Sequence, residues 1–183
     1  MSCGNHNRKV TMEKNEYPFV RLRAMEPEDL DFLYGIENDE RIWNVGVTNV
    51  PYSKNLLLDY IATQSGDIFT DKQVRLMVEN VDAETIGIVD LINFSPIHRR
   101  AELGIVIQNK YRGKGFASAT ILKVLDYCRK ILRLHQIYAI VPENNENCLK
   151  MLKNVGFQES RGLDDWLFDG ESYCSAYFFQ YFL

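Results

Sequence analysis

The segment IVIQNKYRGKGFASAT, residues 105–120, carries two glycines on either side of a lysine, between an apolar run and a helical pattern. Glycine accepts positive φ and lets a ligand approach the backbone closely. A strand that runs into a helix here leaves backbone N–H groups without partners, and the helix dipole, Arg112 and Lys114 add positive charge. The pattern therefore predicts a phosphate site around Gly113 and Gly115. A plain glycine-rich turn is the alternative.

Two common phosphate motifs do not match this loop. The P-loop needs GxxxxGK followed by Ser or Thr, whereas Phe116 follows Gly115 here. The dinucleotide motif GxGxxG needs a third glycine where Ser118 stands, and it follows the first strand of its fold, whereas three or four predicted strands precede this loop. A nucleotide-binding protein remains a hypothesis, and it predicts that ATP or NAD protects the protein against heat.

The surrounding patterns predict one mixed α/β domain over residues 18–183. Strands are predicted in FVRLRAM (19–25), QVRLMVEN (73–80), TIGIVDLINF (85–94), RAELGIVIQ (100–108) and HQIYAIVP (135–142). Two more strands are predicted, one before and one after a turn at Asp169 and Gly170, and the strand before the turn starts near Asp164. Helices are predicted from Pro27, from a cap at Ser53 with Leu56, Leu57, Tyr60 and Ile61 on its apolar face, over about 115–132, and over 145–155 before Gly156. The first 17 residues are polar and are expected to form a disordered leader.

Composition excludes several classes of protein. The chain has 183 residues, a formal charge of -4 and 46% hydrophobic residues, so a sizeable core is expected and a nucleic-acid partner is not. It has no run of 18 apolar residues and no signal-peptide pattern at its start, so no membrane partner is expected. The cysteines Cys3, Cys128, Cys148 and Cys174 are far apart, which predicts free thiols in the cytoplasm. Neither these residues nor the three histidines have metal-ligand spacing, and no metal site is expected.

Three segments in order resemble the GNAT N-acetyltransferase superfamily. AELGIVIQNKYRGKGFASATILKVLDYC resembles its acetyl-CoA motif, which is a splayed strand, a Q/R-x-x-G-x-G/A loop and a long helix. NENCLKMLKNVGF resembles its second CoA-contacting segment, and FVRLRAMEPEDLDFL its first strand and helix. Lys110 stands where glutamine or arginine is usual. Within the superfamily the chain resembles the ribosomal-protein-alanine and spermidine N-acetyltransferases. The resemblance implies a mostly antiparallel sheet with splayed strands, flanked by helices.

The resemblance also implies acetyl-CoA as cosubstrate. Backbone groups of Ile105 and Ile107 would pair with the pantetheine arm like an added strand, and the amide near Ile105 would stabilise an oxyanion. Asn145 would bond the pantetheine or adenylate region. The residues implied around the pyrophosphate are Arg112, Gly113, Lys114, Gly115, Phe116, Ala117 and Ser118.

Direct transfer of an acetyl group to a primary amine needs a base that removes a proton from the amine. Glu102 is one candidate, since a glutamate at the matching position lines the acceptor pocket of the spermidine enzymes. The alternative for Glu102 is a cross-strand partner of Arg99 or Arg100. Asp90 is the second candidate, because it interrupts the apolar run IGIVDLI and a carboxylate there must be paired or open to a cleft.

The proton donor is harder to assign. Leu152 stands where many family members have a tyrosine. Cys148 is a candidate donor because its ordinary pKa, about 8.5, is close to that of an alkyl thiol. Its alternative is a small buried helix residue, which is how buried cysteine usually behaves. Tyr173 and Tyr177 on the last strand are further candidates.

The acceptor predicted from these features is a small amine, a polyamine or a protein N-terminus. The segment ENDERIWNVGVTNVPYS (37–53) would line its pocket, with Glu37, Asp39 and Glu40 as acidic residues. Trp43 would either form an apolar wall of this pocket or pack on the core, which is where tryptophan is usually buried. A second hypothesis is a GNAT-fold module that binds acyl-CoA without catalysis, which the missing tyrosine favours. The aromatic end YFFQYFL is consistent with a homodimer edge and equally with a core strand.

Overall fold

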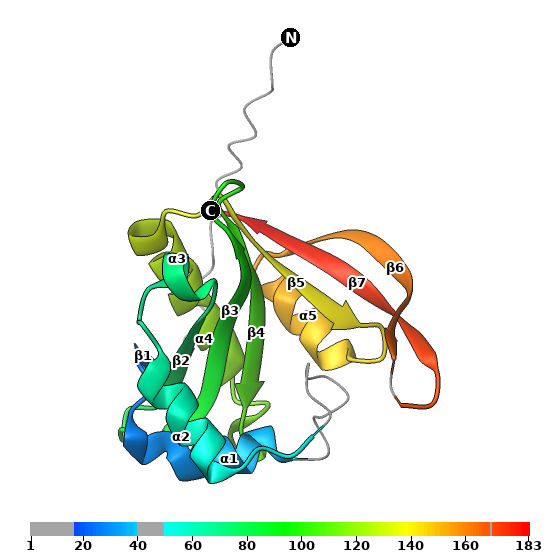
Figure 1. Cartoon of the computed structure of the whole chain (residues 1–183). Coiled ribbons are helices and arrows are strands. Elements are labelled where there is room, and N and C mark those ends of the chain that lie inside the picture. The colour runs from blue at the N-terminus through cyan, green and yellow to red at the C-terminus, as the bar shows by residue number, and fades with distance from the viewer. Residues whose placement is uncertain (1–16, 40–49, 169) are drawn as a thin grey trace.

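The computed structural model describes residues 17–39, 50–168 and 170–183 (Figure 1). The strands are β1 (Arg21–Arg23), β2 (Val74–Glu79), β3 (Thr85–Ser95), β4 (Arg100–Ile107), β5 (Gln136–Pro142), β6 (Gln158–Phe168) and β7 (Tyr173–Phe182). The α-helices are α1 (Leu30–Glu37), α2 (Lys54–Thr63), α3 (Ile68–Asp71), α4 (Phe116–Tyr127) and α5 (Glu146–Asn154). Short 3-10 turns span Pro27–Asp29 and Asn109–Tyr111, and a π-helical turn, Cys128–Leu132, extends α4. Most of the predicted leader, Glu40, Trp43 and Asp169 lie outside the described residues.

The strands form one sheet in the order β1-β2-β3-β4-β5-β7-β6. Neighbours are antiparallel except for β4 and β5, which run parallel. This parallel pairing is short and joins Arg100–Glu102 to Gln136–Tyr138. Both strands continue further, and no later pairs form between them among the described residues, so the sheet opens into a V (Figure 1). The predicted mixed, mostly antiparallel sheet with splayed strands is confirmed.

Each face of the sheet has its own hydrophobic cluster, because successive side chains of a strand point to opposite faces. In β3, Ile88 packs with Leu33 of α1 and Leu57 of α2. Val89, one residue later, belongs to the main core together with Ile121 of α4 and residues of α5. We call the first of these the α1–α2 face. Asp90, two residues after Ile88, points to the same face, whereas Ile86 and Phe94, which lie next to register shifts, pack in the main core.

Local capping signals in the sequence correctly located three helix ends. Pro27 is the first residue of the turn that leads into α1. The Ser53 hydroxyl accepts a hydrogen bond from the Leu56 amide at 3.2 Å and caps α2. Gly156 follows α5 with φ of 99°, the left-handed conformation in which glycine commonly ends a helix.

Some predicted bounds were wrong. Strand β1 has three residues rather than seven, and β6 begins at Gln158 rather than near Asp164. Helix α3 was not predicted, since four residues show no periodicity and its cap, the Asp67 carboxylate, is a local signal easily missed. Leu56 is 53% exposed rather than buried, because the buried stripe of α2 consists of Leu57 and Ile61, four residues apart.

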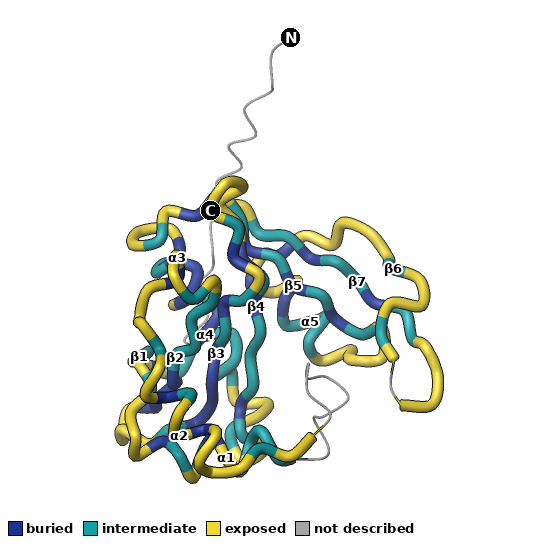
Figure 2. The backbone as a smooth tube through the Cα atoms, viewed as in Figure 1, coloured by how far each residue is buried: buried dark blue, intermediate teal, exposed yellow. Residues whose placement is uncertain are grey.

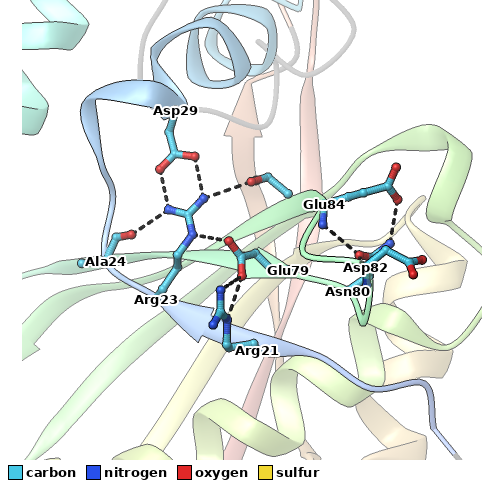
Figure 3. A network of polar contacts seen from close by, with 9 residues as sticks. Arg21, Arg23, Ala24, Asp29, Glu79, Asn80, Asp82 and Glu84 are labelled. Atoms are coloured by element: carbon cyan, nitrogen blue, oxygen red, sulfur yellow. Dashed lines mark hydrogen bonds and ion pairs between the residues drawn. The ribbon is translucent and has the colours of Figure 1, made fainter.

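An ion-pair network fastens the edge strand β1 to the sheet (Figure 3). Arg23 donates to both oxygens of the buried Asp29, at 2.6 and 2.8 Å, and also to Glu79 at the end of β2. Arg21 donates its Nε to the other oxygen of Glu79 at 2.8 Å. Hydrogen bonds from these arginines, Arg23 foremost, lower the pKa of Glu79, so it stays ionised at neutral pH. The network holds β1 and the start of α1 against the beginning of the β2–β3 turn.

The described residues contain neither a membrane-spanning helix nor a cluster of metal-ligating side chains. No helix there is long and apolar enough to cross a membrane. No group of three or more His, Cys, Asp and Glu side chains lies together as metal ligands would.

Candidate active site

The backbone of β4 presents hydrogen-bonding groups to the open V. The Gln108 amide donates to the Ile86 carbonyl at 2.9 Å, so Gln108 and the residues two apart from it point their backbone groups toward β3. Ile105 and Ile107 alternate with these residues, and their backbone groups therefore point toward β5. The Ile107 carbonyl already accepts from Arg112 Nε at 2.8 Å, whereas the edge at Ile105 lies where β5 has diverged. This edge suits an extended, amide-containing ligand.

The glycine loop has the conformation that its sequence predicted. Gly113 and Gly115 both have positive φ, 73° and 83°. Helix α4 starts directly after Gly115, and its first backbone hydrogen bond joins the Ala119 amide to the Gly115 carbonyl at 3.0 Å. The amides of Phe116–Ser118 therefore have no acceptor inside the helix, and no side chain caps them in the described structure. A cluster of such amides at a helix N-terminus binds anions.

Cations and a cavity adjoin this loop. Arg112, Lys114 and Lys110 are all exposed there. A cavity of about 400 Å³ lies between α1 and the end of β4, lined by Phe32 and Ile36 on one side and by residues 106–110 and Arg112 on the other. The cavity is also lined by Asp31 and Asp39, so the free amides and the cations of the loop suit a diphosphate, whereas Phe32 and Ile36 suit a partly apolar arm.

Asp90 points to the α1–α2 face, where Arg75 of β2 holds it. Arg75 donates to both Asp90 oxygens, at 2.7 and 2.9 Å, and also to Glu37 of α1. The Tyr60 ring lies 5.7 Å from the Arg75 guanidinium and completes the cluster. From the sequence, Asp90 had to be either paired or open to a cleft, and in the structure it is paired. An amine would have to compete with a guanidinium for its oxygens, so the geometry argues against Asp90 as the base.

Glu102 occupies the apex of the V. It pairs with Tyr138 at the last position where β4 and β5 are joined, and its side chain lies on the same face as that of Asp90. It accepts a hydrogen bond from Asn93 Nδ2 at 2.8 Å, and the Tyr138 side chain is also within hydrogen-bonding reach, so these two residues, rather than Arg99 or Arg100, are its partners. Glu102 is half-buried and forms no ion pair with any residue that the structure describes, so this carboxylate can accept a proton from a ligand in the V.

Arg75 and Tyr138 are site residues that sequence reasoning missed. A cation inside the strand QVRLMVEN is the same signal that singled out Asp90, so Arg75 could have been found. Tyr138 gave no signal of its own, since it lies within a buried strand. Its ring stacks on Phe178, and burial, followed by the charge of Glu102, raises its pKa.

The sequence profile of the acetyltransferase (GNAT) domain matches residues 20–158 of the chain. The chain belongs to the GNAT acetyltransferase family. This confirms the family predicted from the three motifs, and with it an acetyl-CoA-dependent N-acetyltransferase that transfers an acetyl group to a primary amine.

Similar proteins place this GNAT enzyme near the spermidine acetyltransferases. It is 34% identical over 149 residues to spermidine N(1)-acetyltransferase of Vibrio cholerae, covering 81% of this chain and 84% of that protein. It is 29% identical over 153 residues to the Escherichia coli spermidine N(1)-acetyltransferase, covering 83% and 80%. A crystal structure of the Vibrio cholerae enzyme with CoA and spermine superimposes with a TM-score of 0.78 at 32% identity, covering 89% of this chain and 95% of that one.

Neither Leu152 nor Cys148, the two α5 residues at candidate proton-donor positions, is suited to that role. Leu152 is 1% exposed and packs in the main core. Cys148 packs against the same core, and burial raises its pKa to about 11. A thiol with this pKa is a weaker acid than an ordinary alkyl thiol, so proton transfer from it to a departing thiolate is uphill. Asn145 uses its side-chain oxygen to cap α5, accepting from the Cys148 amide at 3.2 Å.

We expect a Cys148→Ala variant to keep nearly all of its kcat. A true general acid contributes about a hundredfold or more, so its loss would be plain in steady-state kinetics at neutral pH. A fall of that size in kcat, with an unchanged melting temperature, would restore Cys148 as the proton donor.

Proposed function

We propose that this enzyme acetylates polyamines, with Glu102 as the general base and the loop 112–118 holding the CoA pyrophosphate. The similarity to the spermidine enzymes supports the acceptor class. The observation that carries the assignment is the position of Glu102, a half-buried carboxylate at the point where β4 and β5 separate.

The roles of the residues follow from their positions. The amides of Phe116–Ser118 and the cations Arg112 and Lys114 bind the diphosphate. The free backbone edge at Ile105 aligns the pantetheine arm and places an amide beside the thioester carbonyl. Acetyl-CoA supplies the acetyl group, which passes to the amine as CoA leaves. Glu102 accepts the proton that the amine must lose.

The charge near Glu102 suits a cationic acceptor. On the α1–α2 face, Arg75 shares its single positive charge between two carboxylates, Asp90 and Glu37. With Glu102 added, and with Arg100 near Tyr138, three carboxylates stand against two guanidinium groups. A substrate with several ammonium groups gains from such a field, whereas a peptide N-terminus carries only one.

A thiol-release assay with an acceptor panel tests this function. The panel contains spermidine, spermine, an aminoglycoside and peptides that begin with alanine or serine. We expect the highest kcat/KM with spermidine or spermine. Turnover with the peptides alone would assign the enzyme to protein N-termini, and CoA binding without turnover on any amine would make it a non-catalytic module.

We also propose that the chain self-associates through the β6–β7 arm. Figure 1 shows this hairpin extending from the sheet, and Figure 2 shows that most of β6 is exposed. Trp166, Phe168 and Tyr173 near its tip are all more than half exposed. A Vibrio cholerae relative, 30% identical with a TM-score of 0.74 over 89% of this chain and 93% of that one, is described as dodecameric. Light scattering of the wild type and of Trp166→Ser measures the state, and a monomeric wild type overturns the proposal.

A cytoplasmic location completes the proposal. Cys128, Cys148 and Cys174 are free thiols in the structure, as a reducing compartment favours.

A further inference from the structure

The turn between β2 and β3, residues 80–84, touches the loop that is proposed to bind the pyrophosphate. Tyr111 lies between the end of β4 and Gly113, and its hydroxyl donates to Glu84 Oε2 at 2.6 Å. Hydrogen bonds from Tyr111 first, and from Asn80, lower the pKa of Glu84, so its carboxylate is ionised and accepts at neutral pH. The two residues are 27 positions apart in the chain.

Glu84 is itself held firmly (Figure 3). The buried Asn80 donates its Nδ2 to Glu84 Oε2 at 2.7 Å, and its Oδ1 accepts from the amides of Asp82 and Glu84 at 3.0 and 2.9 Å. Asn80 follows Glu79, which the arginines of β1 bind. The acceptor for Tyr111 is therefore anchored to the sheet rather than carried on a loose side chain.

Tyr111 in turn contacts both sides of the glycine pair. Its ring meets that of Phe116, the first residue of α4, edge to face with centroids 5.6 Å apart. The ammonium groups of Lys110 and Lys114 lie 4.7 and 5.9 Å from the centre of the same ring. Holding the Tyr111 hydroxyl therefore restrains the positions of the loop before Gly113 and after Gly115.

We propose that Glu84 is a positioning residue for the cofactor loop and acts through Tyr111. The inference rests on the proposed pyrophosphate site. Charge alone would give Glu84 the opposite effect, since a carboxylate close to the loop repels a diphosphate. Its contribution to binding must then come from the hydrogen bond, which keeps the loop amides in the shape that the anion needs and lowers the entropy lost on binding.

Three variants separate geometry from charge. Glu84→Ala and Tyr111→Phe both remove the hydrogen bond, and we expect each to raise the KM for acetyl-CoA and the dissociation constant for CoA about five- to tenfold, with kcat within about twofold. Glu84→Gln keeps an oxygen with two lone pairs for Tyr111 and Asn80, so we expect nearly wild-type values. Asp82→Asn removes a charge from the same exposed turn, and no change is expected.

A double-mutant cycle decides the outcome. Glu84→Ala combined with Tyr111→Phe should weaken CoA binding no more than Glu84→Ala alone, because Glu84→Ala already removes the one contact that Tyr111→Phe breaks. Additive losses, an unchanged Tyr111→Phe enzyme, or a Glu84→Gln enzyme as weak as Glu84→Ala would each overturn the inference. If Gly115→Val weakens CoA while these variants do not, the pyrophosphate site stands and only the role of Glu84 fails. If none of them changes CoA affinity, the site itself is wrong.

Discussion

A Gly115→Val variant should bind CoA about a hundredfold more weakly, or worse, and still fold. The φ of 83° at this position costs a residue with a side chain about 1–2 kcal/mol, and more for a β-branched one. An added Cβ would also lie 3.2 Å from Pro18 Cδ, so Pro18 or the loop must move by a few tenths of an ångström. Because the proposed phosphate ligands are amides, a shifted backbone would lose hydrogen bonds to a charged group, each of which contributes about 1.5–3 kcal/mol.

Isothermal titration with CoA measures this loss, and thermal unfolding shows whether the variant is folded. Gly162→Val is the matched control, since Gly162 lies in β6, outside the left-handed region, with open space around its Cβ position. The control should bind CoA as the wild type does. If Gly115→Val also binds normally, the glycine loop is not the pyrophosphate site.

A Glu102→Gln variant should lose about a hundredfold or more in kcat while its affinity for CoA stays the same. Glutamine preserves the shape and can keep the contact with Asn93, but it cannot take a proton from the amine. The loss should therefore fall on the chemical step rather than on cofactor binding. Steady-state kinetics with a saturating polyamine, together with CoA titration, separates the two quantities.

Asp90→Asn provides the comparison for Glu102. This substitution removes the negative charge that pairs with Arg75, whose side chain is mostly buried. The main effect of Asp90→Asn should therefore be a lower melting temperature. Large loss of kcat in Asp90→Asn with full activity in Glu102→Gln would reverse the assignment and make Asp90 the base.

The features that the sequence predicted well depend on neighbouring residues only. Three examples are the positive φ of the glycine pair before α4, the cap of α2 at Ser53, and the end of α5 at Gly156. Each of these depends on dihedral angles and hydrogen bonds within a few residues, so the local sequence was enough to predict it. The family motifs share this local character. They were therefore sufficient for the enzyme class and for the order of the elements apart from α3, whereas the position of the cofactor loop stays a prediction.

The contacts that shape the candidate site depend on strand register and packing between distant segments. No local sequence pattern indicates that Arg75 lies opposite Asp90 or that β4 and β5 separate after Glu102. The same holds for the hydrogen bond between Tyr111 and Glu84. A shift of one residue in register would turn each of these side chains to the other face of the sheet. Which carboxylate is paired and which is available at the V is therefore a property of the folded sheet, and neither Glu102 nor Asp90 could be preferred before it was known.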